Sequence, residues 1–328
     1  MKRYVPYFLI FVLIAGLHGF GILSPLDNLL TDHRFRLTER PATGDLVLVE
    51  IDAASLNQLD EWPWPRRYHG ALLDRLMAAG AKRVAFDIDF SGRSREEDDA
   101  LFAQAIERAK GRVVLPVFEQ HATSASDDPT TLVNQPIAAL RKHALLASVT
   151  VYPEANGQVR QMALAENLGG TWYPTLPALL ADETVRSEGR FLIDFGIDVR
   201  TIPRLTYADV LAGKFRADFL RGKTVIVGAV ALELGEQIST PLNPVLSGPV
   251  LQALAYESIV QNRTLHRLAW VAIIVVTLLI SMIAGPYIVA LNWRYGAMRP
   301  SAASPFFTVW AMRCRPLYRL RSKPDPGC

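Results

Sequence analysis

Two long hydrophobic segments, one near each end, constrain this chain more than any other feature. Residues 4–26 carry no acidic or basic side chain apart from the titratable His18, and residues 268–291 carry none. A helix of about 24 residues is about 36 Å long, which exceeds the ~30 Å hydrocarbon thickness of a bilayer. We therefore predict two transmembrane helices, an N-terminal anchor over residues 1–26 and a second helix over residues 268–291, with the lipid bilayer as a partner.

Basic residues lie beyond the outer end of each hydrophobic segment. Lys2 and Arg3 precede the first, and the tail of residues 292–328 is rich in arginine. The positive-inside rule then places both ends in the cytoplasm and residues 27–267 outside it, as in a multi-pass protein of the cell inner membrane. The alternative is that the first segment is a cleaved signal peptide, with residues 19–21 as the cleavage site, but the middle is exported in either case.

The composition is that of a folded domain, with 50% hydrophobic and 20% charged residues. Because the basic excess is confined to the two ends, the middle is net acidic, and a nucleic-acid partner is not expected. Both cysteines, Cys314 and Cys328, lie in the tail, and the six histidines show no metal-ligand spacing. We therefore predict no disulfide, no metal site and no cofactor.

The pattern of residues 27–267 predicts a single α/β domain. A strand, a helix and a strand follow one another within residues 45–90, and such a βαβ unit has parallel strands. The sheet should therefore be largely parallel or mixed. The predicted strands are residues 45–52, 82–90, 111–118, 191–196 and 222–230, with two more in 144–165 around a loop at 153–157. The predicted helices are residues 66–80, 95–110, 207–212 and an amphipathic helix over 249–265.

Two capping boxes and one acidic run indicate where helices begin. Ser94 with Glu97, and Ser55 with Gln58, match the Ser/Thr-x-x-Glu/Gln pattern of a helix N-terminus. The acidic residues 96–99 fall in the first turn of the second predicted helix, where negative side chains complement the positive end of the helix dipole.

An unusual block, "DEWPWPRRYHG" at residues 60–70, precedes the first predicted helix. In a structural interpretation, the two prolines fix an extended loop, Trp62 and Trp64 cover the edge of the core, and Arg66 begins the helix. In a functional interpretation, the same loop offers rigid aromatic faces, together with the guanidinium groups of Arg66 and Arg67, to an anionic or planar ligand. Loops at the end of a sheet of this kind are frequent binding sites.

Three carboxylates favour a ligand of the opposite charge. Asp52 ends the first predicted strand, and Asp87 and Asp89 project from one face of the second. In parallel strands all three would gather at the carboxyl edge of the sheet, where a cation or an amine could bind. The alternative is that Asp87 or Asp89 caps neighbouring backbone or forms an ion pair with Arg66.

Three stretches together resemble the type-2 CHASE domain family, namely residues 49–90, 153–160 and 220–260. These are extracytoplasmic sensory domains of bacterial adenylate cyclases, histidine kinases and cyclic-diguanylate enzymes. The resemblance covers about residues 27–288. It implies a sensor without catalytic residues that binds an unknown small-molecule or envelope signal and passes it through the second transmembrane helix to a cytoplasmic output. A homodimer is expected, because output enzymes of this class work as pairs.

The chain departs from that family pattern in two places. The family usually has an aspartate after the strand at residues 222–230, where the nearest carboxylate of this chain is Glu236. The family also continues through about three membrane helices into an enzyme, whereas residues 292–328 show no hydrophobic periodicity. We interpret this tail as a truncated or frameshifted end, or as a basic segment on the membrane surface. Without an output domain, the chain needs a cytoplasmic signalling partner.

Two other functions fit parts of the sequence. A hydrophobic strand that ends in Asp87-x-Asp89 resembles the nucleophile motif of haloacid-dehalogenase-like phosphatases, which would make the domain a Mg-dependent phosphohydrolase. However, Phe90 follows where a small residue should stand, and the later acidic pair, Asp98 and Asp99, comes too early. A passive envelope scaffold that binds another protein is the third alternative. The sequence as a whole favours the non-enzymatic sensor.

Overall fold

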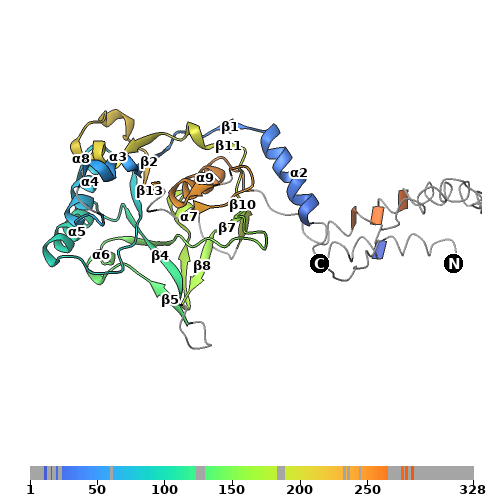
Figure 1. The fold of residues 1–328 in the computed structure, drawn as a ribbon, viewed down its shortest axis with the longest axis horizontal. Coiled ribbons are helices and arrows are strands. Elements are labelled where there is room, and N and C mark those ends of the chain that lie inside the picture. The colour runs from blue at the N-terminus through green and yellow to red at the C-terminus, as the bar shows by residue number, and fades with distance from the viewer. Residues whose placement is uncertain are drawn as a thin grey trace, which may run out of the picture. The chain divides into compact units, whose positions relative to one another are not determined.

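The computed structural model describes residues 24–264, except 60–61, 123–129, 183–188, 232–233, 235–236 and 244, and isolated positions in the two hydrophobic segments (Figure 1). Residues 24–267 form one compact unit, and residues 1–23 with 268–328 form another. The predicted membrane helices and the tail of residues 292–328 lie almost wholly outside the described residues. Among the residues described, no helix is both long and apolar enough to cross a membrane.

A central sheet organises the larger unit. Among the described residues it has seven strands, in the order β12, β2, β13, β3, β4 and β5, with β6 also paired to β4. The β4–β5 pair is antiparallel and the other pairs are parallel, which confirms the expectation of a mixed, largely parallel sheet. The bounds are β2 Leu46–Ile51, β3 Arg83–Asp87, β4 Val113–Ala122, β5 Thr130–Asn134, β6 Leu145–Ser148, β12 Arg204–Thr206 and β13 Thr224–Ala229.

Helices cover both faces of this sheet (Figure 1). The period of two in a strand places Leu46 and Leu48 of β2 in one core, and Val47, Val49 and Ile51 in the other. The second core lies under α3 Ala53–Gln58, α4 Arg66–Ala78, α5 Glu96–Arg108, α6 Ala138–Arg141 and α8 Tyr207–Ala212. The first lies under α7 Leu176–Leu180 and α9 Gly248–Val260.

Short strand pairs surround the sheet on the α9 side. The strand predicted at residues 191–196 is β10 (Arg190–Leu192), which pairs with β7 (Gln161–Ala163) outside the central sheet. The two strands predicted in residues 144–165 are β6 and β7, which therefore belong to different sheets. The other pairs are β1 Arg40–Pro41 with β11 Ile197–Asp198, β8 Ala165–Leu168 with β9 Thr171–Pro174, and β14 Gln237–Ile238 with β15 Leu246–Ser247. Two 3-10 turns, η1 Val199–Thr201 and η2 Ala217–Phe219, complete the connections.

Both predicted capping boxes are wrong. Helix α5 begins after Arg95 and has no side-chain cap, and the amide N–H of Ser94 donates to the carboxylate of Asp99 (3.3 Å) and not to that of Glu97. Helix α3 is capped by Asp52, whose carboxylate accepts the amide N–H of Ser55 (2.9 Å). A predicted ligand residue, Asp52, is thus used as a helix cap.

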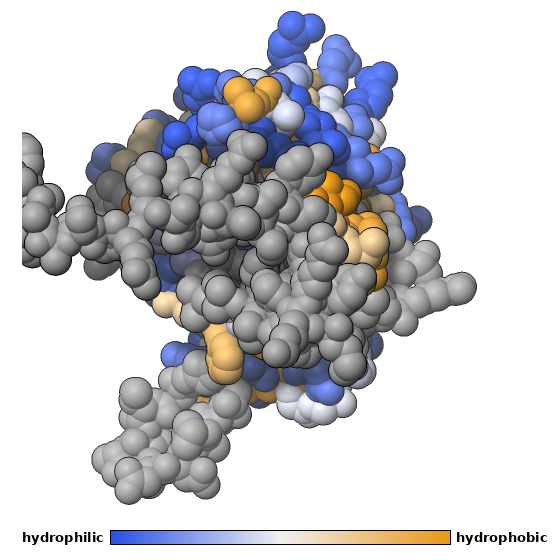
Figure 2. All heavy atoms as spheres, turned by 90° about the vertical axis from the view of Figure 1, so that its right-hand side faces the viewer, coloured by the Kyte–Doolittle hydropathy of each residue, from blue (hydrophilic) through white to orange (hydrophobic). Residues whose placement is uncertain are grey.

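Helix α9 is not amphipathic, contrary to the prediction, because residues 249–259 are all buried. By contrast, α2 (Ser24–Leu37), which the sequence did not predict, exposes four leucines: Leu26, Leu29, Leu30 and Leu37. Figure 2 shows one side of the molecule, where the coloured side chains are mostly hydrophilic with small apolar patches between them. Such a surface is normal for a domain in contact with water.

Candidate functional site

The tryptophans of the 60–70 block belong to the core. Trp64 is 3% exposed, and its ring lies 4.6 Å from that of Tyr207 in α8. Trp62 meets Trp64 edge-on, with ring centroids 5.1 Å apart. The pair closes the edge of the core beside α4, which is the arrangement that the structural interpretation of this block predicts.

The arginines of the block bind α5. Arg66 is 7% exposed and forms an ion pair with Asp99 (2.7 Å), while Arg67 pairs with Asp98 (3.1 Å). Arg66 also donates to the carbonyl oxygen of Gly92. The expected pairing of Arg66 with Asp87 or Asp89 is therefore wrong, because α5 supplies the carboxylates, and its acidic run does more than complement the helix dipole.

A small cavity of about 270 Å³ lies against the block, lined in part by Trp62, Trp64, Arg66 and Asp89. His69 at its wall is buried, and its Nδ1 lies 2.9 Å from the hydroxyl of Tyr207. Burial, and then the charge of Arg66, lowers the pKa of His69 to about 3. The imidazole is therefore neutral at physiological pH, and burial likewise raises the pKa of the Tyr207 hydroxyl.

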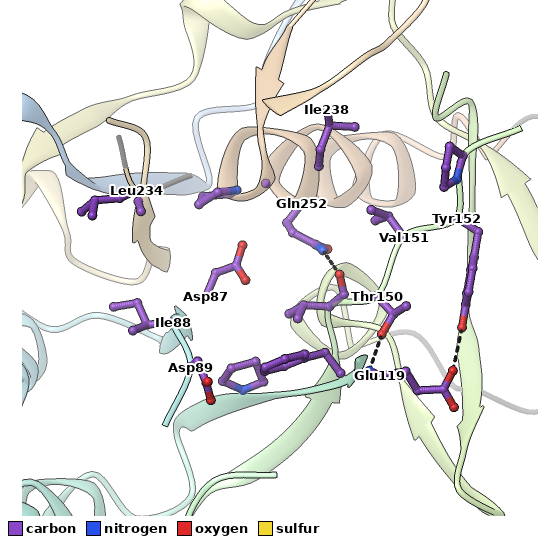
Figure 3. Close-up of a pocket in the computed structure, with 17 residues that line it drawn as sticks. Asp87, Ile88, Asp89, Glu119, Thr150, Val151, Tyr152, Leu234, Ile238 and Gln252 are labelled. Carbon is purple, nitrogen blue, oxygen red and sulfur yellow. Dashed lines mark hydrogen bonds between the residues drawn. The ribbon is translucent and has the colours of Figure 1, made fainter. Parts of the chain in front are cut away.

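A larger cavity, of about 530 Å³, lies at the carboxyl ends of β3 and β6 and along the middle of β4, beside the first turns of α9 (Figure 3). We call it the α9 cavity. It brings together Asp87 and Asp89 from the end of β3 with Glu119 from β4. Asp52 is not part of it, because β13 separates β2 from β3. Of the other predicted ligand residues, Arg67 lines neither cavity.

The first turn of α9 packs closely against the sheet because residue 228 of β13 is a glycine. A Cβ on Gly228 of β13 would overlap Pro249 Cγ and lie 2.9 Å from Pro249 Cβ, so only glycine allows this approach. On the same helix turn, a Cβ on Gly248 would lie 3.5 Å from Oδ2 of Asp87. The carboxylate of Asp87 therefore sits at the positive end of α9, where a negative charge is favoured.

The charge of the α9 cavity is negative. Asp87, Asp89 and Glu119 line it, and no lysine, arginine or histidine is among its described lining residues. Burial, followed by the charges of Glu166 and Glu119, raises the pKa of the Tyr152 hydroxyl at the rim. No group of three or more histidine, cysteine or carboxylate side chains in the described part of the chain could hold a metal ion.

The comparison with protein families decides the identity of the fold. The family model of the CHASE2 domain matches residues 8–286, which is more than half of the chain. The chain belongs to the CHASE2 domain family. This match confirms the resemblance inferred from residues 49–90, 153–160 and 220–260. CHASE2 domains are sensory domains of the extracytoplasmic type. No curated protein and no solved structure matches this sequence.

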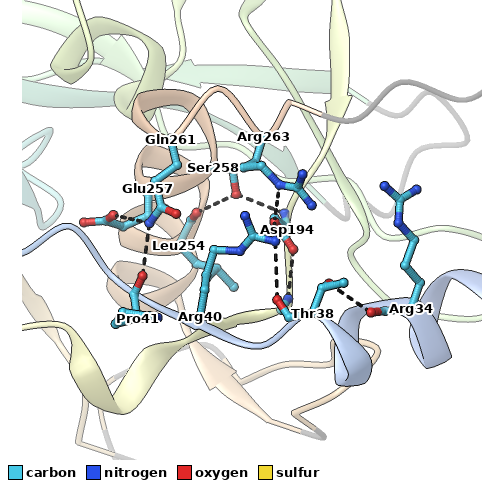
Figure 4. Close-up of polar contacts among 11 residues, drawn as sticks. Arg34, Thr38, Arg40, Pro41, Asp194, Leu254, Glu257, Ser258, Gln261 and Arg263 are labelled. Atoms are coloured by element: carbon cyan, nitrogen blue, oxygen red, sulfur yellow. Dashed lines mark hydrogen bonds and ion pairs between the residues drawn. The ribbon is translucent and has the colours of Figure 1, made fainter.

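In this CHASE2 domain, a buried carboxylate joins the incoming and outgoing segments of the chain (Figure 4). The side chain of Asp194 is fully buried, and its Oδ2 lies 3.1 Å from Nε of Arg263, after α9, and 3.6 Å from Arg40 in β1. Its Oδ1 accepts the amide N–H of Gly196 (3.0 Å). Its own amide N–H donates to the hydroxyl of Ser258 in α9 (2.9 Å). We call Arg40, Asp194, Ser258 and Arg263 the junction cluster.

A second buried carboxylate strengthens this junction. Glu257 of α9 accepts both the amide N–H (2.8 Å) and the hydroxyl (2.9 Å) of Thr43. Gln261 donates to Glu257 (3.0 Å) and to the carbonyl oxygen of Pro41 (3.2 Å). The C-terminal turns of α9 are thus hydrogen-bonded to the segment that leads into the CHASE2 domain.

Sequence reasoning missed several polar residues of the α9 cavity and of the junction cluster. Glu119, Tyr152 and Gln252 line the α9 cavity, and Asp194 holds the junction cluster. A signal for Glu119 was present, because it directly follows the strand predicted at residues 111–118, at the edge of the sheet where Asp87 and Asp89 were expected. Gln252 and Asp194 gave no such signal, since their places depend on contacts between residues far apart in the CHASE2 sequence.

Proposed function

We propose that this chain is a membrane-anchored sensor, in which residues 27–267 bind a signal in the α9 cavity outside the cytoplasm. The signal then passes through α9 to residues 268–291 and on to a cytoplasmic signalling output. The observation that carries this proposal is the position of α9. One end of this helix lines the cavity, and the other end is bound to the junction cluster.

The physical properties of α9 suit it to this task. Its 13 residues correspond to about 20 Å of helix. Because residues 249–259 are buried, a push at the first turn displaces packed side chains along the helix, and close-packed interiors transmit such strain. A ligand needs to favour one position of α9 by only about 1 to 3 kcal/mol to shift the population substantially.

The partners of such a sensor follow from its position. The bilayer holds the hydrophobic segments, and a cytoplasmic signalling partner or domain receives the signal. A second copy of the chain is expected, because a homodimer turns a small shift of each outgoing segment into a relative movement of two. We assign no enzymatic activity to the domain.

The test is a distance measurement in the full chain, reconstituted in lipid nanodiscs, with Cys314 and Cys328 replaced by serine. Spin labels at the exposed Leu37 and Asn262 report on the incoming and outgoing segments, and a control pair at Leu101 and Leu132 reports on α5 and β5. The probes are butylamine, butyrate, glucose and MgCl₂. The proposal expects at least one probe to change the 37–262 distance and leave the control distance unchanged. A probe that raises the melting temperature and leaves both distances unchanged contradicts it.

A further inference from the structure

One residue that lines the α9 cavity has a buried polar atom without a hydrogen-bond partner. Gln252 is 2% exposed and lines the cavity. Its Nε2 donates to the carbonyl oxygen of Val149 (3.1 Å), which fixes the orientation of the amide (Figure 3). Its Oε1 has no hydrogen-bond partner among the described residues. A buried acceptor without a hydrogen bond destabilises the folded state, so the site is suited to a ligand that brings an N–H or O–H donor.

The position of this acceptor relates it to Asp87. Gln252 follows Gly248 by four residues, so the two lie on the same face of α9, one turn apart. The carboxylate of Asp87 lies against that face at Gly248. Because Cβ positions four residues apart on a helix are about 5 to 6 Å from each other, the carboxylate of Asp87 and the side chain of Gln252 contact neighbouring turns of the same helix face.

The remaining lining supports a ligand that is positively charged at one end and apolar elsewhere. The charged residues that line the cavity are all acidic. The wall between them is largely apolar and includes Pro116, Phe118, Val149, Val151 and Ile238. The volume of about 530 Å³ lies within the usual range for small-molecule sites, and a site that binds a bare metal ion needs neither this volume nor this apolar wall.

We propose that the α9 cavity binds a small organic ammonium ion, whose N–H groups donate to Gln252 Oε1 and to the acidic side chains, and whose apolar body lies against the valine and proline wall. That the bound ammonium ion acts as a signal rests on the proposed function. The binding itself is independent of whether α9 transmits anything.

The test is isothermal titration calorimetry of the full chain in nanodiscs. Butylamine and 1,4-diaminobutane should bind saturably. Tetramethylammonium lacks N–H donors, butanol lacks the charge and butyrate reverses it, so each should bind at least tenfold more weakly. Gln252→Leu keeps the side-chain size, removes the acceptor and should weaken amine binding at least tenfold. Glu119→Gln should weaken it about threefold or more, and Glu97→Gln, at an exposed position of α5 outside the cavity lining, should not change it.

Several results overturn the inference. They are preferential binding of butyrate or Mg²⁺, no amine binding at all, or amine binding that is unchanged in both Gln252→Leu and Glu119→Gln. Failure of the proposed function is distinguishable from these. If amines bind in the cavity without changing the 37–262 distance, transmission fails and the ligand class stands. If glucose or butyrate changes that distance and amines do not bind, transmission stands and the ligand class fails.

Discussion

Arg40 and Arg263, which are separated by almost the whole domain in sequence, contact the same carboxylate oxygen of Asp194. One arginine lies in the segment that enters the domain and the other in the segment that leaves it. Because the side chain of Asp194 is fully buried, its charge is screened little by water. The incoming and outgoing segments are therefore held together by ion pairs to a carboxylate in the interior of the domain.

The first prediction concerns this carboxylate. Asp194→Asn retains an acceptor for Gly196 and removes the charge that faces two arginines, so it should lower the free energy of unfolding by about 2–4 kcal/mol. The matched control is Asp218→Asn, because Asp218 pairs with Arg221 at the exposed surface, and it should change stability by less than about 1 kcal/mol. Urea denaturation followed by tryptophan fluorescence measures both. Equal effects would contradict a special role for Asp194.

The second prediction compares two neighbouring ion pairs. Asp99→Asn leaves the buried guanidinium of Arg66 without its carboxylate and should cost about 3–5 kcal/mol. Asp98→Asn affects Arg67, whose side chain is 42% exposed and can be solvated, and should therefore cost less than Asp99→Asn.

A double variant tests whether the first of these costs comes from an unpaired charge. Arg66→Met combined with Asp99→Leu should be more stable than Asp99→Asn alone, because no buried charge remains. Thermal unfolding of the wild-type protein, Asp99→Asn and the double variant gives the order of their stabilities. A double variant that is less stable than Asp99→Asn would show that the ion pair itself supplies net stability.

The third prediction is a dependence of stability on pH. His69 has a pKa of about 3 in the folded domain, against an ordinary value of 6.5. As pH falls below about 6.5 the unfolded chain takes up a proton at this residue and the folded domain does not, so stability falls by up to about 1.4 kcal/mol per pH unit until about pH 3. His69→Gln should remove this part of the slope, whereas His143→Gln, at a partly exposed position, should retain it. Unfolding curves at pH 7, 6, 5 and 4 measure the difference, and identical slopes for wild type and His69→Gln would contradict it.

The fourth prediction concerns the packing of α9 against β13 of the sheet. Gly228→Ala would place a Cβ on Pro249 and force the first turn of α9 away from β13, at a cost of about 1–3 kcal/mol. Amine binding should weaken as well, because Asp87 and Gln252 would no longer keep their positions. Gly92→Ala is the control, since a Cβ there has no heavy atom within 4 Å. A Gly228→Ala protein with unchanged stability and unchanged amine binding would show that the contact of Gly228 with Pro249 does not determine the position of α9.

The parts of the fold that depend on local pattern were predictable, and those that depend on distant contacts were not. The strands β2 and β3 follow from short runs rich in valine, isoleucine and phenylalanine, and helix α4 between them follows from the spacing of its leucines. The insertion of β13 between those two strands brings a segment over 130 residues away into the pair, and no local pattern specifies it. Helix α9 was misjudged because Glu257 and Ser258 indicate a solvated face, whereas both side chains are buried and bind Thr43 and Asp194, respectively.

The candidate site divides in the same way. Asp87 and Asp89 were expected at a carboxyl edge of the sheet, and both line the α9 cavity. Asp52 was expected beside them, but it caps α3. The partner of Arg66 could not be predicted, because the choice between Asp89 and Asp99 depends on how α5 packs against α4.

The central claim is that a change in the α9 cavity reaches the junction cluster, and hydrogen exchange tests it without knowledge of the ligand. In a full chain with Cys314→Ser and Cys328→Ser, Val151→Cys places one thiol in the cavity wall, and a thiol-reactive ethylammonium reagent attaches a charged group there. The account predicts altered amide exchange at residues 257–263, and no change there when the same group is attached at the exposed Leu132→Cys. Unchanged exchange at residues 257–263 after modification of Val151→Cys would contradict transmission through α9.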